Sequence, residues 1–91
     1  MTDPADEILM ATADAIKRGA LAMWTIYDHP ADYPDGFIAR MHEVATKGGT
    51  HPTSKTLEGE LDELRQLFWR AGLLKVTRHP QDEPQIVETW V

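Results

Sequence analysis

The sequence predicts an α+β domain of two layers, in which one helix lies across a mainly antiparallel four-stranded sheet. Two stretches, near residues 4–18 and 57–71, carry apolar residues at helical spacing. Two other regions alternate between apolar and polar residues, and each contains a proline-rich turn. The resulting element order is α-β-β-α-β-β, which packs most simply as a single sheet. A chain of 91 residues fits one domain, residues 1–91.

The first helix is predicted to begin at Asp3-Pro4. Asp3 is a favourable N-cap residue, and proline suits the first helical position because its missing N–H has no intrahelical partner there. Ile8, Ala11 and Ala15 fall on one face of this helix. Because this apolar stripe is thin and mostly alanine, we expect residues 1–19 to dock loosely or to lean on a second subunit.

The first hairpin is predicted over Leu21–Val44. Its first strand is apolar on both faces, with Met23 on one side and Trp24 on the other, so both faces should be covered. The second strand alternates between Phe37 on one face and Arg40 and His42 on the other. Residues 28–36 hold two prolines and predict a long, stiff turn.

A linker and a second helix are expected to follow. Residues 45–55 contain almost no apolar side chains and predict a flexible connection. The helix is predicted from Leu57 to Ala71, with Gly72 as a left-handed stop after its last turn. Its apolar stripe consists of Leu57, Leu61, Leu64, Phe68 and Ala71.

The end of the second helix carries two adjacent aromatic residues, Phe68 and Trp69. Successive side chains on a helix diverge by about 100°, so both cannot face the same sheet. We expect one of them at a periphery or an interface. Residues 73–91 then predict a second hairpin, with a turn over residues 79–84.

Composition excludes several classes of protein. The net charge of −6, from 15 acids and 9 bases, argues against nucleic-acid binding, which needs clustered basic residues. The absence of cysteine excludes disulfides and thiolate zinc sites. No apolar run approaches the roughly 18 residues of a membrane span, and the acidic N-terminus is unlike a signal peptide. We therefore expect a cytoplasmic protein without nucleic-acid or membrane partners.

Three segments of the chain resemble a group of short bacterial proteins of unassigned function. They are Tyr27–Pro30 (Tyr-Asp-His-Pro), Phe37–Arg40 (Phe-Ile-Ala-Arg) and Ile86–Trp90 (Ile-Val-Glu-Thr-Trp). The pattern of that group allows Ile or Val at the second position of Phe-Ile-Ala-Arg, and any residue before the final Trp. The resemblance covers both hairpins but not the first helix, and it implies no particular activity.

Metal binding and catalysis are the weaker alternatives. His-Pro occurs three times, and the turn at Asp28-His29 and the one at His79 would lie at the same end of the sheet. Imidazole and carboxylate groups there suit a divalent metal. However, no helical spacing of histidines and no nucleophile or phosphate-binding motif accompanies them. We predict no metal, no cofactor and no enzyme, with a metal-dependent enzyme at Asp28-His29 as the third alternative.

Arg40 is the most informative charged residue of the first hairpin. A guanidinium near the end of an apolar strand should find a carboxylate, and Asp28 or Glu88 is the expected partner. Alternatively, its charge belongs to a binding site for an anion or small ligand. The expected ligand-binding residues are then Tyr27, Arg40, His42 and Arg78.

Our preferred hypothesis is a small non-catalytic interaction or accessory protein that forms homo-oligomers, most simply a homodimer, or binds a protein partner. It rests on the strand that is apolar on both faces and on the Phe68-Trp69 pair, in a chain too short to cover both. The expected interface residues are Met23, Trp24 and Trp69. The alternative is the ligand-binding domain with Tyr27, Arg40 and His42.

Overall fold

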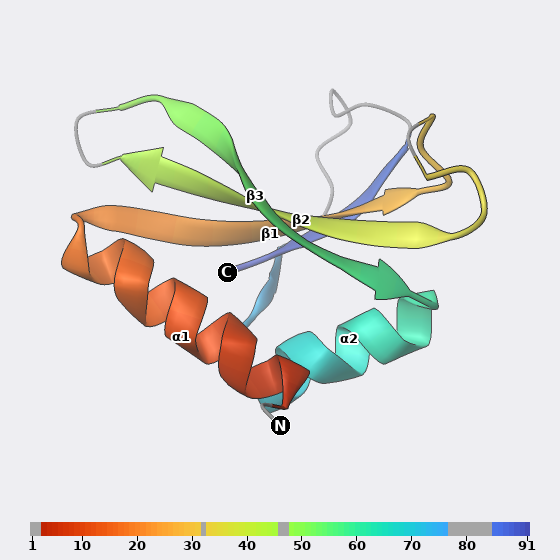
Figure 1. Cartoon of the computed structure of the whole chain (residues 1–91), viewed down its shortest axis with the longest axis horizontal. Coiled ribbons are helices and arrows are strands. Elements are labelled where there is room, and N and C mark those ends of the chain that lie inside the picture. Colours follow the sequence, from red (N-terminus) through yellow and green to blue (C-terminus); the bar gives the residue numbers. More distant parts are fainter. Residues whose placement is uncertain (1–2, 32, 46–47, 77–84) are drawn as a thin grey trace.

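Two helices and five strands build the described part of the chain, in the order α1-β1-β2-β3-α2-β4-β5 (Figure 1). The structure is a computed structural model that describes residues 3–31, 33–45, 48–76 and 85–91. The helices are α1 (Pro4–Lys17) and α2 (Leu61–Arg70). The strands are β1 (Ala20–Asp28), β2 (Phe37–Ala45), β3 (Thr50–Gly59), β4 (Lys75–Val76) and β5 (Ile86–Trp90).

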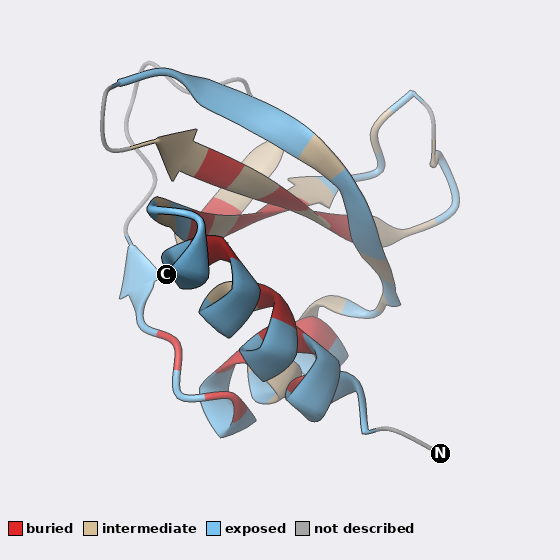
Figure 2. Cartoon of the chain, turned by 60° about the vertical axis from the view of Figure 1, so that its left-hand side comes forward, coloured by how far each residue is buried: buried red, intermediate tan, exposed pale blue. Residues whose placement is uncertain are grey.

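All five strands form one antiparallel sheet with the order β3-β2-β1-β5-β4. Both helices lie on the same face of this sheet and meet near the N-terminus of the chain (Figure 1). Figure 2 shows that the buried residues gather where the helices face the sheet. The predicted α+β class is confirmed, whereas the prediction of four strands is wrong because β3 adds a fifth.

Strand β3 replaces the predicted linker and the first turn of the predicted second helix. It pairs along β2, and the hydroxyl of Thr53 donates to the carbonyl of Met41 at 3.0 Å. The register shifts between Arg40 and His42, where Pro52 lies in β3. A proline is tolerated there because it can donate no hydrogen bond and is confined to edges and bulges. Leu57 therefore belongs to a strand, and α2 begins at Leu61.

The ends of the helices follow the sequence signals. Asp3 is the N-cap residue of α1, and its carboxylate accepts the backbone N–H of Ala5 at 2.8 Å. The other oxygen of Asp3 accepts from Arg70 at 2.6 Å, which connects the start of α1 to the end of α2. Gly72 has φ +81°, the left-handed conformation expected after a helix.

The centre of the core is an aromatic group contributed by β1, α2 and β5. The ring of Phe68 lies 5.6 Å from that of Trp24 and 5.8 Å from that of Trp90. Trp24 is only 3 % exposed. The prediction that Trp24 forms an interface is therefore wrong, because the helix layer of its own chain covers it. From α1, the core receives Ala5, Ile8, Ala11 and Ala15.

Each helix is also joined to the sheet by an arginine–glutamate pair. Arg18, the residue after α1, donates to both carboxylate oxygens of Glu43 on β2, at 2.5 and 2.8 Å. Arg65 on α2 donates to Glu88 on β5 at 2.7 Å. Both carboxylates are buried while both guanidinium groups reach solvent. The pairs therefore bring two acidic groups into the interface between helices and sheet with their charge compensated.

Candidate functional site

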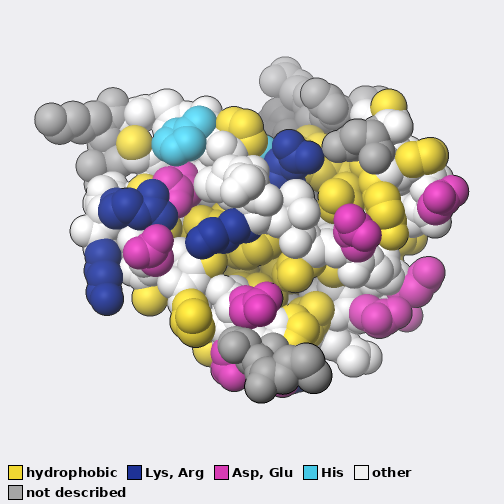
Figure 3. Space-filling model, in the orientation of Figure 1, with side chains coloured by type: hydrophobic (Ala, Val, Ile, Leu, Met, Phe, Trp, Pro, Cys, Tyr) yellow, Lys and Arg dark blue, Asp and Glu magenta, His cyan; other side chains and the backbone are white. Residues whose placement is uncertain are grey.

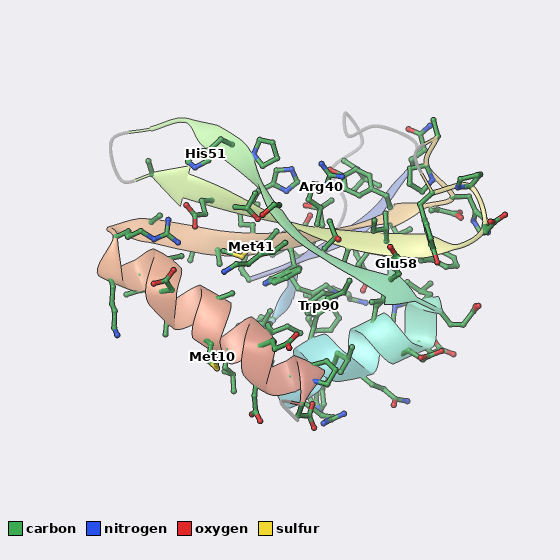
Figure 4. All side chains as sticks on the ribbon, in the orientation of Figure 1. Met10, Arg40, Met41, His51, Glu58 and Trp90 are labelled. Carbon is green, nitrogen blue, oxygen red and sulfur yellow. The ribbon has the colours of Figure 1, made fainter. Side chains whose placement is uncertain are left out.

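The face of the sheet opposite the helices carries the residues predicted to bind a ligand. Side chains alternate along β2, so Met41 points to the helices while Arg40 and His42 point away from them. In Figure 4, Arg40 lies on the other side of the sheet from Met41 and Trp90. Both helices of the described chain cover the Met41 side. We call the Arg40 side the outer face.

A pocket of about 410 Å³ lies on the outer face, and Tyr27, Arg40 and His42 all line it. Ile38 and Pro52 contribute apolar side chains to its lining, which also includes Gln85. The three predicted residues thus come together from β1 and β2. The fourth, Arg78, lies outside the described residues. We call this site the outer-face pocket.

The electrostatics of the outer-face pocket are set by Arg40 and His42. Partial burial lowers the pKa of His42; a hydrogen bond with the Arg40 backbone opposes this lowering, and the charge of the Arg40 side chain adds to it, so that the pKa remains below its ordinary value. The imidazole is therefore neutral at neutral pH and becomes a second cation when the pH falls. Tyr27 and Arg40 each already have an interaction partner in the protein, so a bound anion would have to compete with existing contacts.

Glu88 is not the partner of Arg40. Its carboxylate lies on the helix side of the sheet, where it accepts from Arg65 and, at 2.8 Å, from the indole N–H of Trp90. Burial alone would raise the pKa of Glu88, but these hydrogen bonds leave the pKa below its usual value. The expected Arg40–Glu88 pair is therefore wrong, because alternation along the strands places the two side chains on opposite faces.

The Asp28-His29 turn contains one imidazole–carboxylate contact. The Nδ1 atom of His29 contacts the carboxylate of Asp28, and both side chains are about half exposed. The His29 ring packs edge-on against Phe37 at 5.2 Å between centroids. His79 lies outside the described residues. Among the residues that are described, no group of three or more histidine or acidic side chains is placed to hold a metal ion.

A second, larger cavity lies on the helix side, between α1 and β3, and the sequence did not indicate it. Its volume is about 730 Å³, and Trp24 and Leu57 are among the apolar residues that line it. Figure 3 shows apolar side chains exposed between these two elements. The nearest sequence signal is the run of alanines on α1, since small side chains leave space against the sheet. We call this site the helix-side cavity.

The third surface feature is an apolar patch formed by Trp69 and Leu74, which are 73 and 69 % exposed and line one shallow groove. Val76 on β4 is 45 % exposed, but its pairing with Thr89 places it on the outer face. Phe68 beside Trp69 is completely buried, as the divergence of neighbouring helical side chains requires. The patch borders β4, which is an edge strand among those described, and Arg65 and Trp90 line the same groove. Met23, by contrast, is half-buried on the outer face.

Comparisons of the chain with protein-family models, curated proteins and solved structures give no match. The resemblance to the short bacterial proteins therefore stays a prediction. Neither helix of the described chain has the length and apolar character needed to cross a membrane.

Proposed function

We propose that this protein is a small non-catalytic binding domain that takes a small oxyanion, a carboxylate, sulfate or phosphate group, in the outer-face pocket. The observation that supports this most is the convergence of Tyr27, Arg40 and His42 on one pocket. From the sequence alone, these three side chains formed the alternative hypothesis, a site for a small ligand or an anion.

The chemistry of the three groups suits an oxyanion. A guanidinium forms paired hydrogen bonds to carboxylate or phosphate oxygens, and a phenol and an imidazole can each donate one more. Because Tyr27 and Arg40 already have partners, the ligand must replace existing contacts and its affinity will be modest. An anion favours the charged form of His42, so binding should strengthen as pH falls below the ordinary histidine range.

Sulfate is a suitable probe because its charge is constant between pH about 5 and about 8, where histidine titrates. We expect sulfate to shift the NMR signals of the His42 ring and the Tyr27 ring, and to bind more tightly at the lower pH. Arg40→Gln should abolish these shifts, whereas Arg70→Gln, on the helix layer, should leave them intact. Equal sulfate binding by both variants, or binding that is insensitive to pH, would contradict the proposal.

A second candidate function is self-association through the apolar patch of Trp69 and Leu74 together with the adjacent edge strand β4, which carries the exposed Val76. Its specific support is that three large apolar side chains are exposed on or beside an edge strand. The occupant we propose is a second copy of the chain, because β4 of one copy can pair with β4 of another and continue the sheet. A dimer mass in light scattering that returns to the monomer mass in Trp69→Ser would support it.

A further inference from the structure

We propose that the helix-side cavity is a second binding site, for an amphipathic monoanion with an apolar body and one negatively charged group. The cavity is on the opposite side of the sheet from the outer-face pocket, and the two have no lining residue in common. The proposal therefore stands or falls separately from the oxyanion function.

The walls of the cavity are suited to an apolar body. Ile8 and Ala11 on α1, Trp24 on β1 and Leu57 on β3 form its apolar lining. Its volume of about 730 Å³ lies within the roughly 300–1,000 Å³ typical of small-molecule sites. The space exists because α1 presents mostly alanine to the sheet, at Ala5, Ala11 and Ala15.

The charges at the rim favour an anion. Lys17 and Lys55 both line the cavity, and neither forms an ion pair within the described part of the chain. Asp14, also at the rim, is 3.2 Å from Arg18, which also pairs with Glu43. Arg18, Lys17 and Lys55 together therefore exceed these two acids by one positive charge. Glu7 is ten residues from Lys17, about 15 Å along the helix. The Lys17 end of the rim is therefore cationic.

An unsatisfied donor inside the protein is the second observation that points to a ligand. The Nε1 atom of Trp24 is buried and has no hydrogen-bond acceptor among the described residues. The corresponding atom of Trp90 donates to Glu88 at 2.8 Å. A buried donor left without a partner costs about 1–3 kcal/mol. Because Trp24 lines the cavity, this donor is assigned to a ligand oxygen or to a water beside the ligand.

The three tryptophans provide the experiment. Trp24 lines the cavity, Trp90 is buried with its N–H paired, and Trp69 is on the surface, so their indole N–H signals in NMR report three separate places. The probe is 8-anilinonaphthalene-1-sulfonate, which combines two aromatic groups with one negative charge. Its uncharged analogue N-phenyl-1-naphthylamine has a similar body without the sulfonate. We expect the sulfonate to move the Trp24 signal and to bind several-fold more tightly than the analogue.

Two pairs of variants test the apolar body and the charge separately. Ala13→Phe on α1 and Leu57→Phe on β3, where Leu57 pairs with buried Ala39 on the helix side, should each narrow the space and weaken binding. Lys55→Met should weaken binding of the sulfonate about threefold to fivefold, the effect of one exposed charge, without changing binding of the analogue. Lys75→Met is the matched control, since Lys75 borders the apolar patch and should have no effect.

Three results would overturn the proposal. The first is a shift of the Trp69 signal with no change at Trp24, which would place the probe on the apolar patch. The second is unchanged binding in both phenylalanine variants, each shown by its unfolding curve to be folded. The third is equal affinity for the charged and uncharged probes in the wild-type protein, which would exclude recognition of an anion.

Discussion

At the scale of single residues, the buried glutamates show how this small domain tolerates charge in its interior. Glu88 is 4 % exposed and accepts hydrogen bonds from both Arg65 and Trp90. Removing one partner from such a group leaves buried polar atoms unsatisfied, whereas an exposed ion pair contributes little. The cost of a substitution therefore depends on burial more than on the number of contacts.

Glu88→Gln should lower the free energy of unfolding by about 1–3 kcal/mol, because the buried group loses its charge-assisted bonds to Arg65. The matched control is Asp62→Asn. Asp62 is also near Arg65, at 3.9 Å, but its side chain is 90 % exposed, so its loss should be within about 0.5 kcal/mol. Urea unfolding followed by tryptophan fluorescence measures both, and equal losses would contradict the role assigned to Glu88.

Stability should decline in two stages as the pH is lowered. Burial lowers the folded-state pKa of His42 from 6.5, so the unfolded chain binds a proton first and stability falls below pH about 6.5. Hydrogen bonds from Arg18 lower the pKa of Glu43 from 4.5, and Glu88 is lowered as well, so a second decline follows below pH about 4.5.

Unfolding free energies measured in urea across this pH range should show both declines. In His42→Gln the decline near pH 6.5 should become smaller while the acid one remains. If the unfolding free energy of the wild-type protein stayed constant, or rose, as the pH is lowered from about 7.5 to about 5.5, the result would contradict the environment described for His42.

At the scale of elements, β3 is where the sequence was misleading. Residues 50–56 are polar and lack alternation because an edge strand of this kind buries little on either face. Its stability comes from backbone pairing with β2, which leaves no trace in side-chain periodicity. Leu57 has the spacing of the α2 stripe by coincidence, and this extended the predicted helix by a turn.

The two pockets differ in how far the sequence could predict them. Tyr27, Arg40 and His42 belong to the same face of two paired strands, so strand alternation was enough to bring them together. The helix-side cavity depends on the distance between α1 and β3, and β3 was not recognised as a strand. Short side chains such as Ala11 mark it only once both elements are placed.

The attachment of α1 gives a prediction at this scale. Its core contacts are mostly alanine, so the bonds from Arg18 to Glu43 should matter more than usual. Arg18→Gln should increase amide hydrogen exchange in α1 by about tenfold while β1 and β2 change little. Asp14→Asn, which removes the exposed partner of the same arginine, should change exchange by less than about twofold. A uniform increase over the whole chain would mean that α1 is not a separately opening unit.

At the scale of the whole molecule, the two helices cover one face, so that among the described residues the outer face and the two sheet edges are left without a helix. The β3 edge carries Pro52 and Lys55, residues that discourage pairing with another strand. The β4 edge instead carries the exposed Val76 and borders the exposed side chains of Trp69 and Leu74. This asymmetry between the edges favours the β4 side as the place where two copies would meet.

Self-association at that edge would make stability depend on concentration. Binding that occurs only in the folded state raises the melting temperature as protein concentration increases, by mass action. We expect this rise in the wild-type protein and its loss in Trp69→Ser. Met10→Ser, which removes a comparably exposed apolar side chain from α1, should keep the rise. Differential scanning calorimetry from micromolar to millimolar protein measures the effect. A melting temperature that is independent of concentration, together with a monomer mass throughout, would contradict self-association. It would mean that no second copy covers the patch in the folded state.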